Sequence, residues 1–215
     1  MSDTKEKILM AALGLFARDG YEAVPVSAIA DEVGITKGAL YRHYKSKRDI
    51  FDHIVARMFE IDAERARQYE VPDQGFDDDP EKYRSTGTAS IKSFTLAQLE
   101  FWTEDPFASD YRKMLSLERF RDPEMAKLYS DTIVAGPVGY MEDLFREMME
   151  HGAMKPGNSE GHGTPDKADP KVLALEYYAP LFLLIQMWDT ADDKAALKSM
   201  LADHIDRFMI DNSIA

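Results

Sequence analysis

The sequence contains no cysteine, which excludes disulfide frameworks, thiolate zinc sites and thiol catalysis. It also lacks a long apolar run. The longest candidate, residues 179–188, falls well short of the roughly 18 apolar residues that a membrane-spanning helix needs. The N-terminal stretch carries charges where a signal peptide would be apolar. These absences lead us to expect a cytoplasmic protein with no membrane partner.

Catalytic and metal-binding patterns are missing as well. We find no Ser-His-Asp arrangement, no glycine-rich phosphate loop and no paired carboxylates with a defined neighbour. The histidines show no metal-ligand spacing; they are His43, His53, His151, His162 and His204. We therefore expect no enzyme activity, no metal and no cofactor. An all-α enzyme is the alternative that turnover of a co-purified ligand would favour.

Charge is abundant but unevenly distributed. The net charge is −13, yet residues 1–57 hold nine Lys or Arg against eight Asp or Glu, and the remainder holds 17 against 31. Residues 36–48 contain five basic residues and no acid. An acidic protein that keeps one cationic segment is suited to place it on an anion, while the acidic remainder stays off nucleic acid or simply aids solubility.

Apolar residues recur at helical spacing, and no segment has a convincing strand pattern. The pattern predicts an all-α chain of about nine helices, with Gly136-Pro137 causing a kink or split in the seventh. The expected helices cover residues 3–20, 25–34, 36–44, 46–69, 86–103, 109–120, 122–150, 170–189 and 193–211. Loops are expected at 71–80 and 151–169, which are rich in glycine, proline and polar residues.

Two of the predicted helices meet at a corner formed by Gly34, Ile35 and Thr36. Gly34 suits unusual backbone angles, Ile35 can plug the corner into the core, and Thr36 is a natural N-cap for the next helix. Pro25 suits the first position of the preceding helix. Such a corner followed by a basic helix is typical of a helix-turn-helix, whose second helix enters the major groove of DNA.

The start of the second helix carries the residues expected to meet DNA. Lys37 can donate to guanine O6 and N7, and Gly38 lets the backbone approach the duplex closely. Tyr41 lies one helical turn after Lys37, and Arg42 lies one turn after Gly38. A solvated basic face is the alternative, which the adjoining corner makes the weaker interpretation.

Phosphate contacts are expected at the edges of the same segment. The Thr36 hydroxyl, Tyr41 and His43 can each hydrogen-bond to a phosphate oxygen. Lys47 lies where Ser46 and Asp49 predict the start of a fourth helix, so its ammonium and the helix N–H groups favour one phosphate.

Residues 1 to about 58 resemble the TetR family of one-component bacterial regulators. The matching positions are Phe16, Gly20, Ile29-Ala30, Val33-Gly34-Ile35, Thr36-Lys37-Gly38, Leu40-Tyr41 and Tyr44-Lys45-Ser46-Lys47. The resemblance implies a homodimer that binds an operator, and a C-terminal domain whose small-molecule effector controls DNA binding. Two departures are Pro25, where the family often has a threonine, and Tyr44, where phenylalanine is commoner. The family's DNA-contact positions correspond to Ser27, Thr36, Lys37, Gly38, Tyr41, His43 and Lys47.

We expect a helix-turn-helix DNA-binding domain of three helices at residues 1–48 and a larger ligand-binding and dimerisation domain at 49–215. Residues 174–184 are similar to a helix that many family members use for dimerisation in a four-helix bundle. The final helix would pair with it through Leu197, Met200, Leu201, His204 and Phe208.

An apolar ligand pocket in the helical body is a further expectation. Aromatic and methionine side chains could line it, although ordinary core packing is the alternative for each of them. The candidates are Phe94, Phe101, Trp102, Met114, Phe120, Tyr140, Tyr178 and Phe182.

The sequence thus predicts a ligand-responsive transcriptional regulator of TetR type. We expect a repressor that binds a palindromic double-stranded operator as a dimer and is released by an unknown small molecule. An activator is the open alternative to a repressor, since the position of the operator relative to the promoter is not encoded in the sequence. The rival hypothesis is a helical small-molecule-binding dimer that does not read DNA, against which the intact cationic segment argues.

Overall fold

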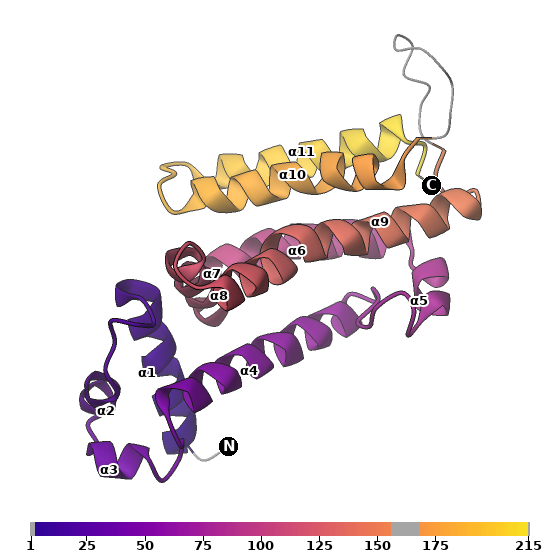
Figure 1. Ribbon diagram of the computed structural model, residues 1–215. Coiled ribbons are helices and arrows are strands. Elements are labelled where there is room, and N and C mark those ends of the chain that lie inside the picture. The colour runs from indigo at the N-terminus through magenta and orange to yellow at the C-terminus, as the bar shows by residue number, and fades with distance from the viewer. Residues whose placement is uncertain (1–2, 156–167, 215) are drawn as a thin grey trace. The chain divides into compact units, whose positions relative to one another are not determined.

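The computed structural model describes residues 3–155 and 168–214, and every regular element among them is helical (Figure 1). The all-α prediction is confirmed. In that described part of the chain, no helix combines the length and apolarity needed to cross a bilayer. The elements are α1 (Asp3–Asp19), α2 (Val26–Val33), α3 (Lys37–Leu40), α4 (Lys47–Gln68), α5 (Pro80–Ser85), α6 (Thr88–Glu104), α7 (Pro106–Glu118), α8 (Pro123–Tyr129), η1 (Ser130–Val134), α9 (Ala135–Glu150), α10 (Pro170–Trp188) and α11 (Lys194–Asp211).

The chain forms two compact units. Unit 1 comprises Met1–Asp62 and Glu104–Ser130, and unit 2 comprises Ala63–Thr103 and Asp131–Ala215. The predicted helix-turn-helix domain at 1–48 lies wholly in unit 1, together with the start of α4 and with α7 and α8. The functional boundary predicted at residue 48 remains a prediction, because the two units are defined by packing.

Unit 1 is organised around α1, which packs on α2 and on α7. Its apolar face is fully buried, as the helical spacing predicted, and includes Ile8, Leu9 and Phe16. Tyr111 and Met114 are equally buried on α7. The helix α1, which packs on the helix-turn-helix through α2, is therefore also held by α7, which comes much later in the sequence.

Gly20 ends α1, as predicted. Its φ is 88°, a left-handed conformation that glycine adopts without strain, and its N–H donates to the carbonyl of Phe16 at 3.0 Å. A Cβ at this position would lie 2.6 Å from Oε1 of Glu118, a buried side chain at the end of α7. The backbone angle favours glycine here, and a side chain would also have to displace the carboxylate of Glu118.

Unit 2 is built from helices that pack around α10. Helix α10 contacts both α9 and α11, and α9 also contacts the short α5. The ring of Tyr177 on α10 lies 5.4 Å from Phe145 and 5.0 Å from Phe208, and its hydroxyl is 2.9 Å from that of Thr95 on α6. Aromatic packing and one buried hydrogen bond thus join four helices.

The predicted pairing of the last two helices is largely confirmed. Leu197, Leu201 and Phe208 are buried, and His204 Nε2 lies 3.2 Å from the carbonyl oxygen of Tyr177. Met200 is the exception, because its side chain is 54% exposed.

The split predicted at Gly136-Pro137 is confirmed, and it takes the form of the π-helical turn η1 immediately before α9. Pro137 has no N–H to donate to the carbonyl of Ile133 four residues earlier. The Tyr178 hydroxyl of α10 donates to that carbonyl instead, at 2.6 Å. A Cβ at Gly136 would lie only 1.7 Å from the carbonyl oxygen of Asp131, so the turn excludes a side chain there.

Several predicted bounds were wrong. Regular helix α3 ends at Leu40 rather than near Tyr44, and α7 begins at Pro106 because Asp105 caps it. The pattern also missed α5, which Asp79 caps. Pro25 is the N-cap of α2 and not its first residue. Of the predicted loop at 151–169, residues 156–167, which include His162, lie outside the described residues.

Candidate nucleic-acid interface

The corner between α2 and α3 closes through its own backbone. Gly34 adopts φ 75° and ψ 32°. Its N–H donates to the carbonyl of Asp31 at 3.0 Å, and the N–H of Ile35 donates to that of Ala30 at 2.9 Å. This pair of bonds is a Schellman motif, which satisfies carbonyls left free at a helix end. The predicted role of Gly34 is therefore confirmed.

Thr36 caps α3 as predicted. Its Oγ1 accepts a hydrogen bond from the N–H of Ala39 at 3.1 Å. Beyond Leu40 the chain continues as hydrogen-bonded turns, in which the N–H of Arg42 donates to Ala39 and the N–H of His43 donates to Leu40. These two bonds span three residues, whereas the N–H of Tyr44 donates to the carbonyl of Leu40 four residues earlier, so tight turns and one helical bond alternate before α4.

The predicted contact residues differ in exposure. Six are exposed on α2, on α3 or in the turns on either side of α3; they are Ser27, Thr36, Lys37, Gly38, Tyr41 and Arg42. His43 and Lys47 are half-buried. Leu40, by contrast, is completely buried and anchors α3 in unit 1. The anchor leaves the polar side of the segment facing solvent.

Three basic side chains of this segment are exposed and have no carboxylate partner in the described part of the chain. Across the described residues, Lys37, Arg42 and Lys45 form no ion pair. The ammonium of Lys37 lies 5.9 Å from the ring centroid of Tyr41, as expected for residues one turn apart. An exposed cluster of unpaired cations next to a fixed corner can bind phosphate groups without first breaking internal contacts.

Lys47 is engaged within the protein. Its ammonium donates to the carbonyl of Tyr21 at 2.8 Å and to that of Glu22 at 3.3 Å, and lies 4.4 Å from the Tyr21 ring centroid. These contacts join the start of α4 to the loop between α1 and α2. The side chain thus has a structural role that its charge and position in the sequence did not indicate.

Tyr44 uses the hydroxyl that a phenylalanine would lack. The hydroxyl donates to the carbonyl of Lys5 on α1 at 3.1 Å, and the ring meets His53 edge-on at a centroid distance of 5.1 Å. Burial raises the pKa of Tyr44 to about 12. The departure from the commoner residue therefore adds a contact between α1 and the segment that follows α3.

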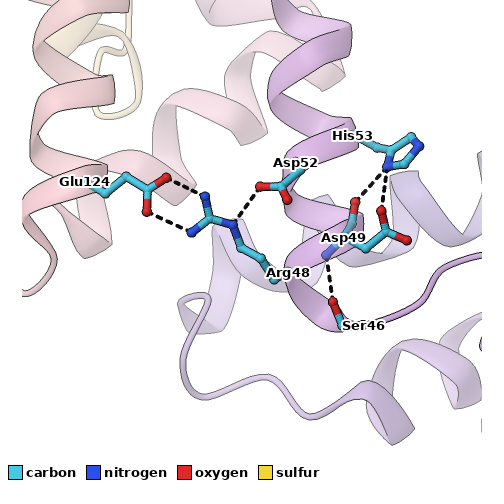
Figure 2. A network of polar contacts seen from close by, with 6 residues as sticks. All are labelled: Ser46, Arg48, Asp49, Asp52, His53 and Glu124. Atoms are coloured by element: carbon cyan, nitrogen blue, oxygen red, sulfur yellow. Dashed lines mark hydrogen bonds and ion pairs between the residues drawn. The ribbon is translucent and has the colours of Figure 1, made fainter.

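The start of α4 holds a polar network (Figure 2). Ser46 Oγ accepts from the N–H of Asp49 at 3.0 Å, which confirms the predicted helix start. Arg48 donates to Asp52 at 2.6 Å and binds both carboxylate oxygens of Glu124 on α8. Hydrogen bonding in this pair raises the pKa of Arg48 and lowers that of Glu124. Sequence reasoning missed the pair, because 76 residues separate its members.

The predicted ligand-lining residues do not form one cluster of rings. Phe101 and Trp102 have centroids 5.2 Å apart, whereas Phe94 contacts Tyr69 and Tyr140 contacts Tyr83. Tyr178 and Phe182 lie on α10, and Met114 is buried in unit 1. Phe120 is 83% exposed, so the single chain does not enclose it, and its place in a ligand pocket stays a prediction.

A second exposed surface lies on α10 and α11. Large apolar side chains are exposed on both helices, among exposed charged residues such as Asp206 and Arg207. The apolar ones are Val172, Leu175, Leu183 and Met187 on α10, and Met200 and Ile210 on α11. Exposed apolar residues that gather on one face can mark a surface for association.

Comparison with known proteins places the N-terminal segment. Residues 8–54 match the family model described as bacterial regulatory proteins, tetR family. The uncharacterized HTH-type transcriptional regulator YerO of Bacillus subtilis is 47% identical over 47 residues, covering 22% of this chain and 16% of its own length. The HTH-type transcriptional repressor BepR of Brucella suis is 39% identical over 56 residues, covering 26% and 27%. The chain thus spans less than a third of each of these two relatives.

Solved structures show the fold over the whole chain. SmeT, the repressor of the Stenotrophomonas maltophilia multidrug efflux pump SmeDEF, has a TM-score of 0.63 at 20% identity, covering 98% of this chain and 91% of its own. A SmeT–triclosan complex has a TM-score of 0.61 at 21% identity, covering 96% and 90%. At these identities the likeness concerns the architecture alone.

Proposed function

We propose that this chain, whose residues 8–54 match the tetR family of bacterial regulatory proteins, is a transcriptional regulator of that family that places α3 in the major groove of operator DNA. The observation that carries the proposal is the exposed surface of Lys37, Tyr41 and Arg42 on a corner fixed by Gly34 and Thr36. Lys37 would read guanine, and Arg42 would bind the backbone.

Gly38 supports the same orientation. A Cβ built on Gly38 meets nothing closer than Thr36 Oγ1 at 3.9 Å, so packing within the chain does not require a glycine there. Glycine inside a helix costs about 0.5–1 kcal/mol relative to alanine. Gly38 therefore lowers helix stability at an exposed position that has room for a side chain. A DNA backbone or base edge that approaches the protein backbone closely at Gly38 would explain why glycine is present.

We infer that the exposed apolar residues of α10 and α11 are covered by a second copy of this chain. Val172, Leu183 and Met200 are already about half buried, so covering them would add on the order of 1 kcal/mol for each side chain, about half the value for burial from full exposure. A twofold axis would then present two α3 helices to successive major grooves, about 34 Å apart. Such a homodimer matches a palindromic operator.

A small-molecule effector completes the proposal. The solved SmeT–triclosan complex supports this part of the proposal, because SmeT shares the architecture and binds triclosan. In this chain the candidate lining residues of unit 2 are Phe94, Phe101, Trp102, Tyr140, Tyr178 and Phe182. Each copy of the dimer has one DNA-binding head, which is its helix-turn-helix around α3. A ligand that binds better to a dimer with a different spacing of the two heads weakens operator binding, and a differential affinity of a few kcal/mol suffices for this repressor-type response.

Fluorescence anisotropy with the purified full chain tests the DNA-binding part. The probes are a labelled duplex from the region upstream of the encoding gene and an unrelated duplex of equal length, each titrated at several salt concentrations. We expect tighter binding to the upstream duplex and affinity that falls steeply with salt for both. Absence of salt-dependent binding to either duplex would refute the proposal and favour a helical ligand-binding dimer that does not read DNA.

A further inference from the structure

Arg48 belongs to the cationic segment, yet it is bound by acids. Each of its three side-chain nitrogens donates to a carboxylate, Nε to Asp52 at 2.6 Å, Nη1 to Glu124 Oε2 at 2.8 Å and Nη2 to Glu124 Oε1 (Figure 2). Asp52 lies one turn along α4 and moves with Arg48. Glu124 lies on α8, so it is the partner that ties the start of α4 to a different helix.

Glu124 is presented by a well-defined helix start. Asp122 Oδ1 accepts from the N–H of Glu124 at 2.7 Å and from that of Met125 at 3.3 Å. Met125 and Tyr129 are buried, and α8 packs on α7. The carboxylate therefore occupies a position set by α8, and a movement of α8 displaces it from Arg48.

The pair is accessible to a competing anion. The side chains of Arg48 and Glu124 are 50% and 56% exposed. An exposed ion pair contributes little to stability, so an exchange of partners requires little free energy. A phosphate offers the guanidinium the same bidentate geometry as a carboxylate. Arg48 directly follows Lys47 at the start of α4, close in the sequence to the segment proposed to meet the DNA backbone.

We propose that Glu124 acts as an internal competitor of DNA phosphate for Arg48. This inference rests on the proposed DNA-binding function. In the latched state Glu124 holds Arg48, and in the released state Arg48 binds a backbone phosphate. Release adds one phosphate contact per head and withdraws one carboxylate from Arg48, so both effects favour binding.

Chain order connects this latch to the second unit. The last residue of α8, Tyr129, is followed directly by η1 at the boundary between the units. Short π-helical turns are frequent at functional sites. A rearrangement of η1 that draws α8 away from α4 would release Arg48, and by reciprocity phosphate binding to Arg48 would favour that rearrangement.

The test measures binding of the full chain to a labelled 30-base-pair duplex of arbitrary sequence between 50 and 200 mM NaCl. We expect Glu124→Gln to bind more tightly, with a gain on the order of threefold to tenfold at the lower salt concentration and a salt slope steeper by about 0.9 per head. Each additional phosphate contact loses roughly threefold to fourfold in affinity across this salt range.

Two further variants separate the latch from general charge. Asp52→Asn removes the same charge beside Arg48 but leaves the tie to α8, so its gain should be smaller and its salt slope unchanged. In the double variant R48Q/E124Q the gain should disappear. An equal gain in Glu124→Gln and Asp52→Asn, a gain that survives Arg48→Gln, or no gain would overturn the latch. Failure of the wild-type chain to bind any duplex would instead refute the proposed function on which the latch rests.

Discussion

The two compact units expose different kinds of side chain. Around α3, unit 1 exposes cations and hydroxyls, including Lys37, Tyr41 and Arg42, while α10 and α11 of unit 2 expose Leu183 and Met200. Unpaired cations are well solvated in water, but exposed apolar side chains gain nothing from remaining there. One surface is thus suited to an anionic partner that comes and goes, and the other to a partner that stays.

The units also stabilise irregular backbone in different ways. The corner in unit 1 relies on neighbours in the sequence, namely Gly34 and the cap from Thr36. The turn η1 in unit 2 relies on Tyr178, whose hydroxyl reaches Ile133 from 45 residues away. Local devices form wherever the segment forms, whereas distant ones require the rest of the unit to be folded.

The largest expected effect, on dimerisation and operator affinity, comes from a charge placed on the apolar surface of α10 and α11. Leu183→Glu places a charge where we propose that a second copy binds, so the dimer should dissociate. Loss of bivalent binding should then lower operator affinity by about 10²–10⁴-fold. Sedimentation velocity and anisotropy would measure the two effects. Phe59→Glu, at a 52% exposed position on α4, is the matched control and should leave the dimer intact. A Leu183→Glu protein that remains a dimer would contradict the assignment.

The next effect tests the backbone of unit 2. Gly136→Ala forces a Cβ against the carbonyl oxygen of Asp131 and should lower the free energy of unfolding by roughly 3 kcal/mol. Gly139 lies in the same helix, and a Cβ there would meet nothing within 4 Å, so Gly139→Ala should instead raise stability by up to about 1 kcal/mol. Urea unfolding of both variants gives the comparison, and equal effects would show that η1 tolerates side chains.

Two substitutions distinguish base recognition from phosphate binding on the charged surface around α3. Lys37→Ala should reduce discrimination between operator and unrelated DNA by about 1–3 kcal/mol, because a base contact is lost. Arg42→Ala should weaken binding to all duplexes alike and reduce the salt slope by about 0.9 per head. Salt-dependent anisotropy on both duplexes separates the two outcomes. Loss of discrimination in Arg42→Ala instead would exchange the assigned roles.

The smallest effect concerns Gly38. Gly38→Ala should raise the free energy of unfolding by up to about 1 kcal/mol, since alanine favours helix and the position has room. The same methyl group should weaken DNA binding if the backbone lies against the duplex. Thermal unfolding and anisotropy on one protein preparation measure both changes. Unchanged DNA affinity would mean that Gly38 does not face the groove.

Much of the helix-turn-helix segment was predictable because its structure is local. The left-handed Gly34, the cap from Thr36, the helix start at Ser46 and the end of α1 at Gly20 all follow from residue types a few positions apart. The end of α3 was misplaced, since residues 42 and 43 have helical composition while their N–H groups bond three residues back instead of four. Sequence spacing does not distinguish these two bonding patterns.

The amino-acid sequence by itself determined the helical class, the corner that orients α3 and the charge placed on it, because these depend on propensity and on contacts within one or two turns. Tertiary structure alone decided which cations are free. Lys47 and Arg48 carry the same charge as Lys37, but the first is bound by carbonyls of the preceding loop and the second by Glu124. The partner of each of these side chains lies on a segment that is distant in the sequence and that only folding brings close. The spacing of residues along the chain therefore does not predict the contact.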